Sequence, residues 1–209
     1  MKLSFESFTP EALAQFTWML TSNFMGAGVI LDGTSLWLDK GEQQVTDPRI
    51  TLRLQAEDDR LVALPCWTSD GYRAENVTLI DHGVLKSHLL NLYAAKKTGR
   101  PVTRNSASAY VMEPGDTPVA DMIRGMKRGL IVGGFSGGQP GTNGEFSGVA
   151  KNSFLVEDGE VRGAVLETMI SGNLAEIFSH VRALSSELVS DGSMAFPYLL
   201  AEGITISGK

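Results

Sequence analysis

The chain has 209 residues, of which 43% are hydrophobic and 20% charged, and its formal net charge is -6. This composition is typical of a globular domain and excludes fibrous and low-complexity classes. An acidic chain whose most basic stretch is KKTGR (96–100) is also a poor candidate for nucleic-acid binding, because contacts to phosphates rely on clustered Lys and Arg.

Cysteine usage and hydropathy indicate where the protein works. Cys66 is the only cysteine, so an intrachain disulfide is impossible, as is usual in a reducing compartment. The opening MKLSFESFTPEAL lacks the apolar core of a signal peptide, and no apolar run approaches the roughly 18 residues of a membrane helix. We therefore expect a cytoplasmic protein that contacts neither membrane nor nucleic acid.

The N-terminal third is predicted to begin with a helix and to continue as strands. Residues 9–24 have Thr9 as a candidate N-cap, Pro10 at the first helical position and apolar residues at a 3.6-residue period. In VILDGTSLWL (29–38), an Asp-Gly pair between apolar segments predicts a hairpin. ITLRLQ (50–55) alternates between apolar and polar residues, as a half-buried strand does.

The middle of the chain is predicted to mix strands with short helices. Residues 75–99 indicate a strand, a turn at His82-Gly83, a second strand and a short helix that ends at Gly99. Residues 117–135 indicate a helix capped by Thr117 and ending near Lys127, followed by the strand LIVGGF.

The C-terminal part is predicted to contain further hairpins and one long helix. Strands flank the turn at Asp158-Gly159, residues 173–188 indicate a helix with Asn173 as N-cap, and the tail indicates a strand pair turning at Glu202-Gly203. The chain is thus predicted to be a single α+β domain spanning residues 1–209. It should have a mainly antiparallel sheet with about three flanking helices and neither linkers nor repeats.

The segment GGFSGGQPGTNGEFSGVAKNSF (133–154) is the richest in glycine. It contains neither G-x-x-x-x-G-K-[ST] nor a G-x-G-x-x-G turn that opens a helix, so a nucleotide site is disfavoured. One interpretation is a turn system in which glycines provide positive φ and close backbone approach. The other is a loop that binds an extended ligand, with four polar contacts: Asn143, Glu145, Lys151 and Asn152. Composition alone favours the first interpretation.

Other catalytic or metal-binding patterns are weak. The three histidines, His82, His88 and His180, form no H-E-x-x-H pair, and Cys66 has no partner at C-x-x-C spacing. Ser136 stands in GFSGG, which is not a G-x-S-x-G elbow. The sequence therefore predicts no catalytic residue and no metal site in this chain.

Several segments together resemble the TldD/PmbA family. They are DHGVLKSHLLNLYAAKKTG (81–99), EPGDTPVADMIRGMKRGLIV (113–132), the run from GGQPGTNGEFSG to SGNLAEIF (137–178) and DGSMAFPYLLAEGITISGK (191–209). They occur in the family's order and cover most of residues 75–209, whereas residues 1–74 match more weakly. The resemblance is to the C-terminal half of these proteins, and the chain is either such a domain or a shortened relative.

The resemblance implies a connection with peptide maturation by proteins formerly called modulators of DNA gyrase. TldD-type members resemble zinc proteases whose ligands are an H-E-x-x-x-H helix in the N-terminal half and a cysteine near the C-terminus. PmbA-type (TldE) members lack these ligands and pair with a TldD-type subunit. This chain has no H-E-x-x-x-H, and SELVSDGSMAFPYLL (186–200) contains no cysteine where the TldD-type ligand is expected.

These features favour a PmbA/TldE-like component of a peptidase system that binds no metal and presents peptide for proteolytic maturation. Whether the chain is itself an enzyme stays open. It should need no cofactor of its own, with any zinc held by a catalytic partner. Expected partners are a TldD-like subunit or a second copy, and a peptide bound by strand addition near Asn143, Glu145, Lys151 and Asn152. The alternatives are a non-enzymatic protein-interaction module and, less favoured, a complete zinc metallopeptidase.

Overall fold

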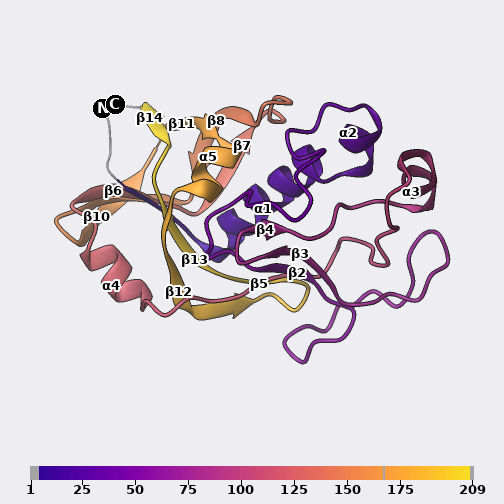
Figure 1. The fold of residues 1–209 in the computed structure, drawn as a ribbon. Coiled ribbons are helices and arrows are strands. Elements are labelled where there is room, and N and C mark those ends of the chain that lie inside the picture. Colours follow the sequence, from indigo (N-terminus) through magenta and orange to yellow (C-terminus); the bar gives the residue numbers. More distant parts are fainter. Residues whose placement is uncertain (1–4, 167, 208–209) are drawn as a thin grey trace.

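The computed structural model describes residues 5–166 and 168–207, and these residues form two β-sheets and five helices (Figure 1). The helices are α1 (Pro10–Phe24), α2 (Ala27–Leu31), α3 (Leu92–Thr98), α4 (Val119–Arg124) and α5 (Leu174–Ser179). The strands are β1 (Phe5–Phe8), β2 (Leu52–Leu54), β3 (Val77–Asp81), β4 (Val84–Leu85), β5 (Tyr110–Met112), β6 (Arg128–Val132), β7 (Gly134–Gly137), β8 (Glu145–Lys151), β9 (Ser153–Glu157), β10 (Glu160–Val165), β11 (Met169–Asn173), β12 (Val181–Ser190), β13 (Ala195–Ala201) and β14 (Thr205–Ser207).

The two sheets differ in size and share no strand. The ten-stranded sheet has the order β10-β9-β6-β1-β13-β5-β2-β3-β4, with β12 paired to β13, and the four-stranded sheet has the order β14-β11-β8-β7. Within the described residues, all strand pairs are antiparallel except β1 with β6 and β13 with β5. The expected α+β class with a mainly antiparallel sheet is confirmed.

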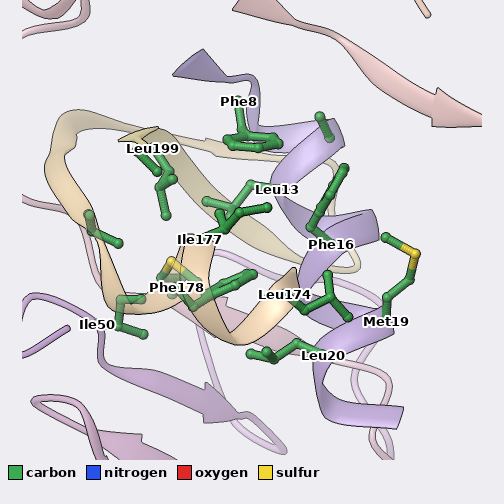
Figure 2. Packing of buried hydrophobic residues seen from close by; sticks show 14 of the residues in the cluster. Phe8, Leu13, Phe16, Met19, Leu20, Ile50, Leu174, Ile177, Phe178 and Leu199 are labelled. Carbon is green, nitrogen blue, oxygen red and sulfur yellow. The ribbon is translucent and has the colours of Figure 1, made fainter. Parts of the chain in front are cut away.

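Helix α1 joins the two sheets. It begins as the sequence predicted, because the Thr9 hydroxyl accepts the Ala12 N–H at 3.3 Å and Pro10 occupies the first turn. The helix contacts β13 of the larger sheet, β7 of the smaller sheet and α5. Its apolar side chains are buried, and Figure 2 shows Leu13 and Phe16 pointing toward the side chains of α5. The core therefore lies around α1.

Aromatic rings tie this core together. Phe16 makes edge-to-face contacts with Phe8, Phe135 and Phe146 at centroid distances of 4.9, 5.4 and 5.1 Å. Phe8 ends β1 of the larger sheet, whereas Phe135 and Phe146 lie on β7 and β8 of the smaller one. One side chain of α1 thus contacts both sheets, and edge-to-face geometry is a favourable arrangement for aromatic rings.

Several local predictions are confirmed. The hairpins β3–β4 and β9–β10 turn at His82-Gly83 and Asp158-Gly159, all four with positive φ. Helix α3 ends at Gly99, whose φ of 69° is the left-handed conformation that favours glycine. The segment after Gly144 forms the strands β8 and β9, as its alternation indicated.

The predicted helix over residues 173–188 is wrong beyond its first turns. Asn173 does cap a helix, but α5 ends at Ser179, and Val181–Ser190 form the ten-residue strand β12. Strand β12 pairs with β13 and has register shifts near Ala183 and Leu188, which disturb the two-residue alternation. Pairing with a strand that follows in the sequence outweighed the local helical pattern, a tertiary effect that propensity cannot capture.

Three other local predictions need correction. Residues 29–38 form no hairpin, because Val29 to Leu31 belong to α2 and Gly33, with a φ of 68°, follows that helix. The tail strands β13 and β14 are not paired with each other, since β14 pairs with β11 in the smaller sheet. Helix α4 starts at Val119 with Pro118 as its cap, so Thr117 is not the cap residue, and it ends at Arg124.

Candidate functional site

A groove of about 990 Å³ lies between α1, β7 and the turn that joins β12 to β13. Its size is that of a ligand-binding groove. The lining residues come from α1 (Pro10, Glu11, Ala14, Gln15, Trp18, Met19), the segment before and into β5 (Ala107, Ser108, Tyr110), the glycine-rich segment (Phe135, Ser136, Gly137, Gly138, Gln139) and the β12–β13 hairpin (Val189, Asp191, Met194, Phe196).

One wall of the groove is the free edge of a sheet. Strand β7 is the end strand of the four-stranded sheet. The Phe135 N–H donates to Oε1 of Gln15 on α1 at 3.0 Å, so this backbone group points away from β8. Successive residues of a strand alternate in the direction of their backbone groups. The N–H and C=O of Gly137 are therefore directed to the same open side as those of Phe135.

Two glycines make this edge possible. Gly137 on β7 faces Gly148 on β8 across the ladder, and the Phe135 ring lies over both backbones. A Cβ atom at Gly148 would stand 2.6 Å from Cζ of Phe135 and 2.6 Å from the Ser136 carbonyl oxygen. Neither distance is tolerable, so glycine at this position lets Phe135 fold back onto the core. These glycines serve close packing within the sheet, beside the groove.

The second wall is the outer face of α1. Glu11, Gln15 and Trp18 follow one another at spacings of four and three residues and so share one face of the helix. The Trp18 side chain is 53% exposed, and the small Ala14 lies next to it on the groove lining. An exposed indole on a wall of a groove is an unusual use of tryptophan, which is more often buried.

The third wall is a rigid turn. Oδ1 of Asp191 accepts hydrogen bonds from the backbone N–H groups of Ser193 at 2.7 Å and Met194 at 2.8 Å, and from the Ser193 hydroxyl at 2.8 Å. These bonds, the one from the Ser193 N–H foremost, lower the pKa of Asp191, so the carboxylate is ionised at neutral pH. The groove therefore has a fixed negative charge on this side.

A strained backbone segment forms the end of the groove. Ala107 has a φ of 55°, which is rare for a residue with a side chain. The buried Asn105 holds it there, since its side-chain oxygen accepts the Ala107 N–H and its amide group donates to the Glu75 carbonyl oxygen. Strain held by such contacts is common beside binding sites.

The four residues that the sequence singled out do not line the groove. Asn143 lies in the loop before β8, where its side chain accepts the Glu145 N–H at 3.1 Å and its carbonyl oxygen accepts from the Asn173 side chain at 2.8 Å. Glu145 is the first residue of β8. Lys151 is exposed at the far end of β8, opposite Gly134. Asn152 has a φ of 48° in the link to β9. A role in peptide binding for these four residues stays a prediction.

The groove residues on α1 were missed by sequence reasoning. The apolar period of residues 9–24 marked the buried face of the helix and gave no role to its other face. The available signal was Trp18, a large aromatic residue that stands outside the apolar stripe of Leu13, Phe16 and Leu20. The walls from β5 and from the β12–β13 hairpin carry no local signal, because only the fold brings these segments together.

The histidines and the cysteine lie apart from one another and outside the groove lining. Nε2 of His88 lies 3.0 Å from the Trp37 carbonyl oxygen, and burial lowers the pKa of its imidazole. His82 is at the β3–β4 turn, His180 follows α5, and Cys66 is exposed in the segment between β2 and β3. Over residues 5–166 and 168–207, no three His, Cys, Asp or Glu side chains converge as metal ligands do. Ser136 does line the groove, but no histidine accompanies it there.

Within the same residues, no helix is long and apolar enough to cross a membrane.

Comparison with solved proteins identifies the class to which this fold belongs. A candidate modulator of DNA gyrase from Bacteroides thetaiotaomicron superimposes with a TM-score of 0.87 and is 26% identical, covering 100% of this chain and 47% of that one. TldE from Thermococcus kodakarensis shares the fold with a TM-score of 0.85 over 99% of this chain and 50% of its own, at 24% identity. This chain therefore has the fold that one half of each of these two proteins adopts.

The chain belongs to the PmbA/TldA metallopeptidase C-terminal domain family, whose model matches residues 7–208. A zinc metalloprotease TldD homologue from Saccharolobus solfataricus is 25% identical over 191 residues, which are 85% of this chain and 43% of the relative. The metalloprotease PmbA of Escherichia coli O157:H7 is 23% identical over 88% of this chain and 42% of its own length. The chain thus spans less than half the length of these curated relatives, and the TldD/PmbA resemblance is confirmed.

Proposed function

We propose that this domain is a PmbA/TldE-like component of a TldD/PmbA-type peptidase system, and that it binds an extended peptide without holding a metal ion. The observation that carries the proposal is the end strand β7, whose Gly137 backbone groups are directed to the open side beside the groove. Strand addition to such an edge captures a peptide through its main chain and therefore suits unstructured substrates of varied sequence.

The contact between Gln15 and Phe135 indicates how a peptide would bind. The Gln15 side-chain oxygen already accepts the Phe135 N–H, the first backbone donor of β7 that points away from β8. A peptide carbonyl oxygen would otherwise lie at this position. Beyond it, the Phe135 carbonyl oxygen and both backbone groups of Gly137 can pair with a peptide that lies between β7 and Trp18. The exposed glycines 137 and 138 leave space for a close approach of the peptide backbone.

The position of the groove supports a site related to that of the metal-binding members. The family resemblance implies that TldD-type members have a cysteine ligand in the segment that corresponds to residues 186–200. In this chain Val189, Asp191, Met194 and Phe196 of that segment line the groove. The only ionisable partners there are Glu11, Asp191 and Tyr110, which do not form a zinc donor set. We propose that any zinc belongs to a TldD-like partner subunit.

Hydrogen exchange tests the strand-addition proposal. The protein is mixed with a pool of unstructured eight-residue peptides at ten times the dissociation constant of the pool. Hydrogen exchange of the Gly137 amide should then slow about tenfold, because this amide can exchange only while no peptide is bound. The Ser136 amide, which faces β8, should change little. The amides of β10, an end strand of the larger sheet, are the internal control.

Methylation of the peptide gives an independent check. A blocked peptide that binds by strand addition loses affinity when the backbone nitrogens that face β7 are methylated and keeps it when the alternate nitrogens are methylated. Equal losses at every position, together with unchanged Gly137 exchange, would show that the peptide does not extend the sheet.

A second candidate function is that of a protein-interaction module that pairs with a TldD-like subunit or with a second copy. Two large apolar side chains are exposed on β9 and β10, the outer strands of the larger sheet, namely Phe154 and Val161, and Leu166 is exposed in the segment after β10. Exposed apolar groups gathered on neighbouring strands are typical of an interface. Light scattering should find the chain as a dimer, or as a heterodimer when a TldD-type subunit is added. A monomer under both conditions would contradict this candidate.

A further inference from the structure

The charges that line the groove all have one sign. Among the described residues, Glu11 and Asp191 are the charged ones that line it, with no lysine, arginine or histidine beside them. They lie on different walls, one on α1 and the other on the β12–β13 turn. A ligand that enters between them meets two carboxylates in a groove whose remaining surface is mostly apolar or glycine backbone.

The Asp191 carboxylate is held in a conformation that suits a cation. Its three hydrogen bonds within the turn all use Oδ1, which fixes the side chain and leaves the Oδ2 atom to accept from a ligand. A carboxylate that has already been immobilised loses less conformational entropy on pairing than a free surface side chain does.

The α1 wall offers a matching surface for the stem of a long cationic side chain. Glu11 and Trp18 are seven residues apart, which is about two turns of the helix. The small side chain of Ala14 between them leaves room for a ligand side chain on the helix surface. The face of an indole attracts Lys and Arg side chains, and their methylene stems pack on apolar surface while the charged head stays near water or a carboxylate. The 53% exposed Trp18 ring offers the apolar face, and Glu11, two turns earlier on the same face of the helix, offers the carboxylate.

We infer that the groove selects basic peptides, with an Arg or Lys side chain lying on Trp18 and its charge between Glu11 and Asp191. This inference rests on the proposed peptide-binding function and deepens it. Main-chain pairing with β7 provides affinity that does not depend on the peptide sequence. The carboxylates on the two acidic walls favour peptides that carry a basic side chain. The resulting substrate class is an extended segment with at least one basic residue.

A blocked peptide pair tests the inference. The probe is acetyl-AALARAA-amide, and its matched control has citrulline in place of arginine, which keeps the shape and removes the charge. Calorimetry should give about tenfold tighter binding for the arginine peptide at low ionic strength, with the difference shrinking in salt. Equal binding of both peptides would overturn the basic selectivity and leave the strand-addition proposal intact. Binding of neither peptide would count against both.

Substitutions in the chain assign the selectivity to these residues. The double variant Glu11→Gln/Asp191→Asn should bind the two peptides equally, and Trp18→Ala should weaken binding of the arginine peptide about fivefold. Glu176→Gln is the matched control, because Glu176 is an exposed acid in the first turn of α5 and lies outside the groove. A preference for arginine that persists in the double variant would place its recognition elsewhere and would overturn the inference.

Discussion

Replacing Phe16 by alanine is expected to lower the free energy of unfolding by about 3–5 kcal/mol. The side chain is 0% exposed and contacts Phe8, Phe135 and Phe146, so its removal leaves a cavity where α1 meets both sheets. Neighbours anchored in two sheets cannot collapse easily into that cavity, which places the cost toward the upper end of the range. Urea unfolding followed by circular dichroism measures the change.

The control for this variant is Trp18→Ala on the same helix. Trp18 is half exposed and faces the groove, so its loss removes less buried apolar surface and should cost about 1 kcal/mol or less. If Phe16→Ala cost no more than Trp18→Ala, the ring cluster would not be the contact that joins the sheets. Because Phe135 packs on Phe16, the Phe16 variant should also disturb the edge of β7 and weaken peptide binding.

The parts of the fold that could be predicted are those set by local chemistry. The cap at Thr9, the Asp158-Gly159 turn and the left-handed Gly99 each fix the backbone over a few residues, and the structure confirms all three. Residues 181–190 could not be predicted in this way. Their mixed pattern fits a helix locally, whereas the paired strand β13 decides the outcome. The separation into two sheets is likewise a property of pairing at long range.

The candidate site was predicted only in part, for the same reason. The glycine-rich segment was interpreted as a turn system or as a loop that binds an extended ligand, and it includes β7, an end strand of the smaller sheet. The glycines at 137 and 148 proved to make room for the Phe135 ring, a contact between neighbouring strands that the composition could not indicate. The other walls come from α1, the approach to β5 and the β12–β13 turn, three segments that lie far apart in the sequence. Periodicity identifies the buried face of each element but does not tell which exposed faces meet.

Glu6 is an ionisable group in the core that the groove does not use. It lies on β1 between β6 and β13, its side chain is 1% exposed, and Oε2 has no hydrogen-bond partner among the described residues. Burial raises the pKa of this carboxyl from 4.5 to about 8, opposed by a hydrogen bond from the Ile204 backbone and reinforced by the charge of Glu202. Glu202 itself stays ionised, because the Arg182 side chain pairs with it and lowers its pKa.

The folded protein therefore keeps a proton on Glu6 up to about pH 8, whereas the unfolded chain releases it near pH 4.5. Between these values the folded state binds more protons, so the free energy of unfolding should fall as the pH rises, by roughly 4 kcal/mol across the window. Glu6→Gln keeps the shape and cannot ionise, so its stability curve should lose this slope and exceed that of the parent protein at pH 8. Urea unfolding at pH 5, 6, 7 and 8 measures both curves, with Glu176→Gln as the control at an exposed glutamate on α5. Parallel curves for the parent protein and Glu6→Gln would show that Glu6 does not titrate in this range, and that its carboxyl finds water or a partner when it ionises.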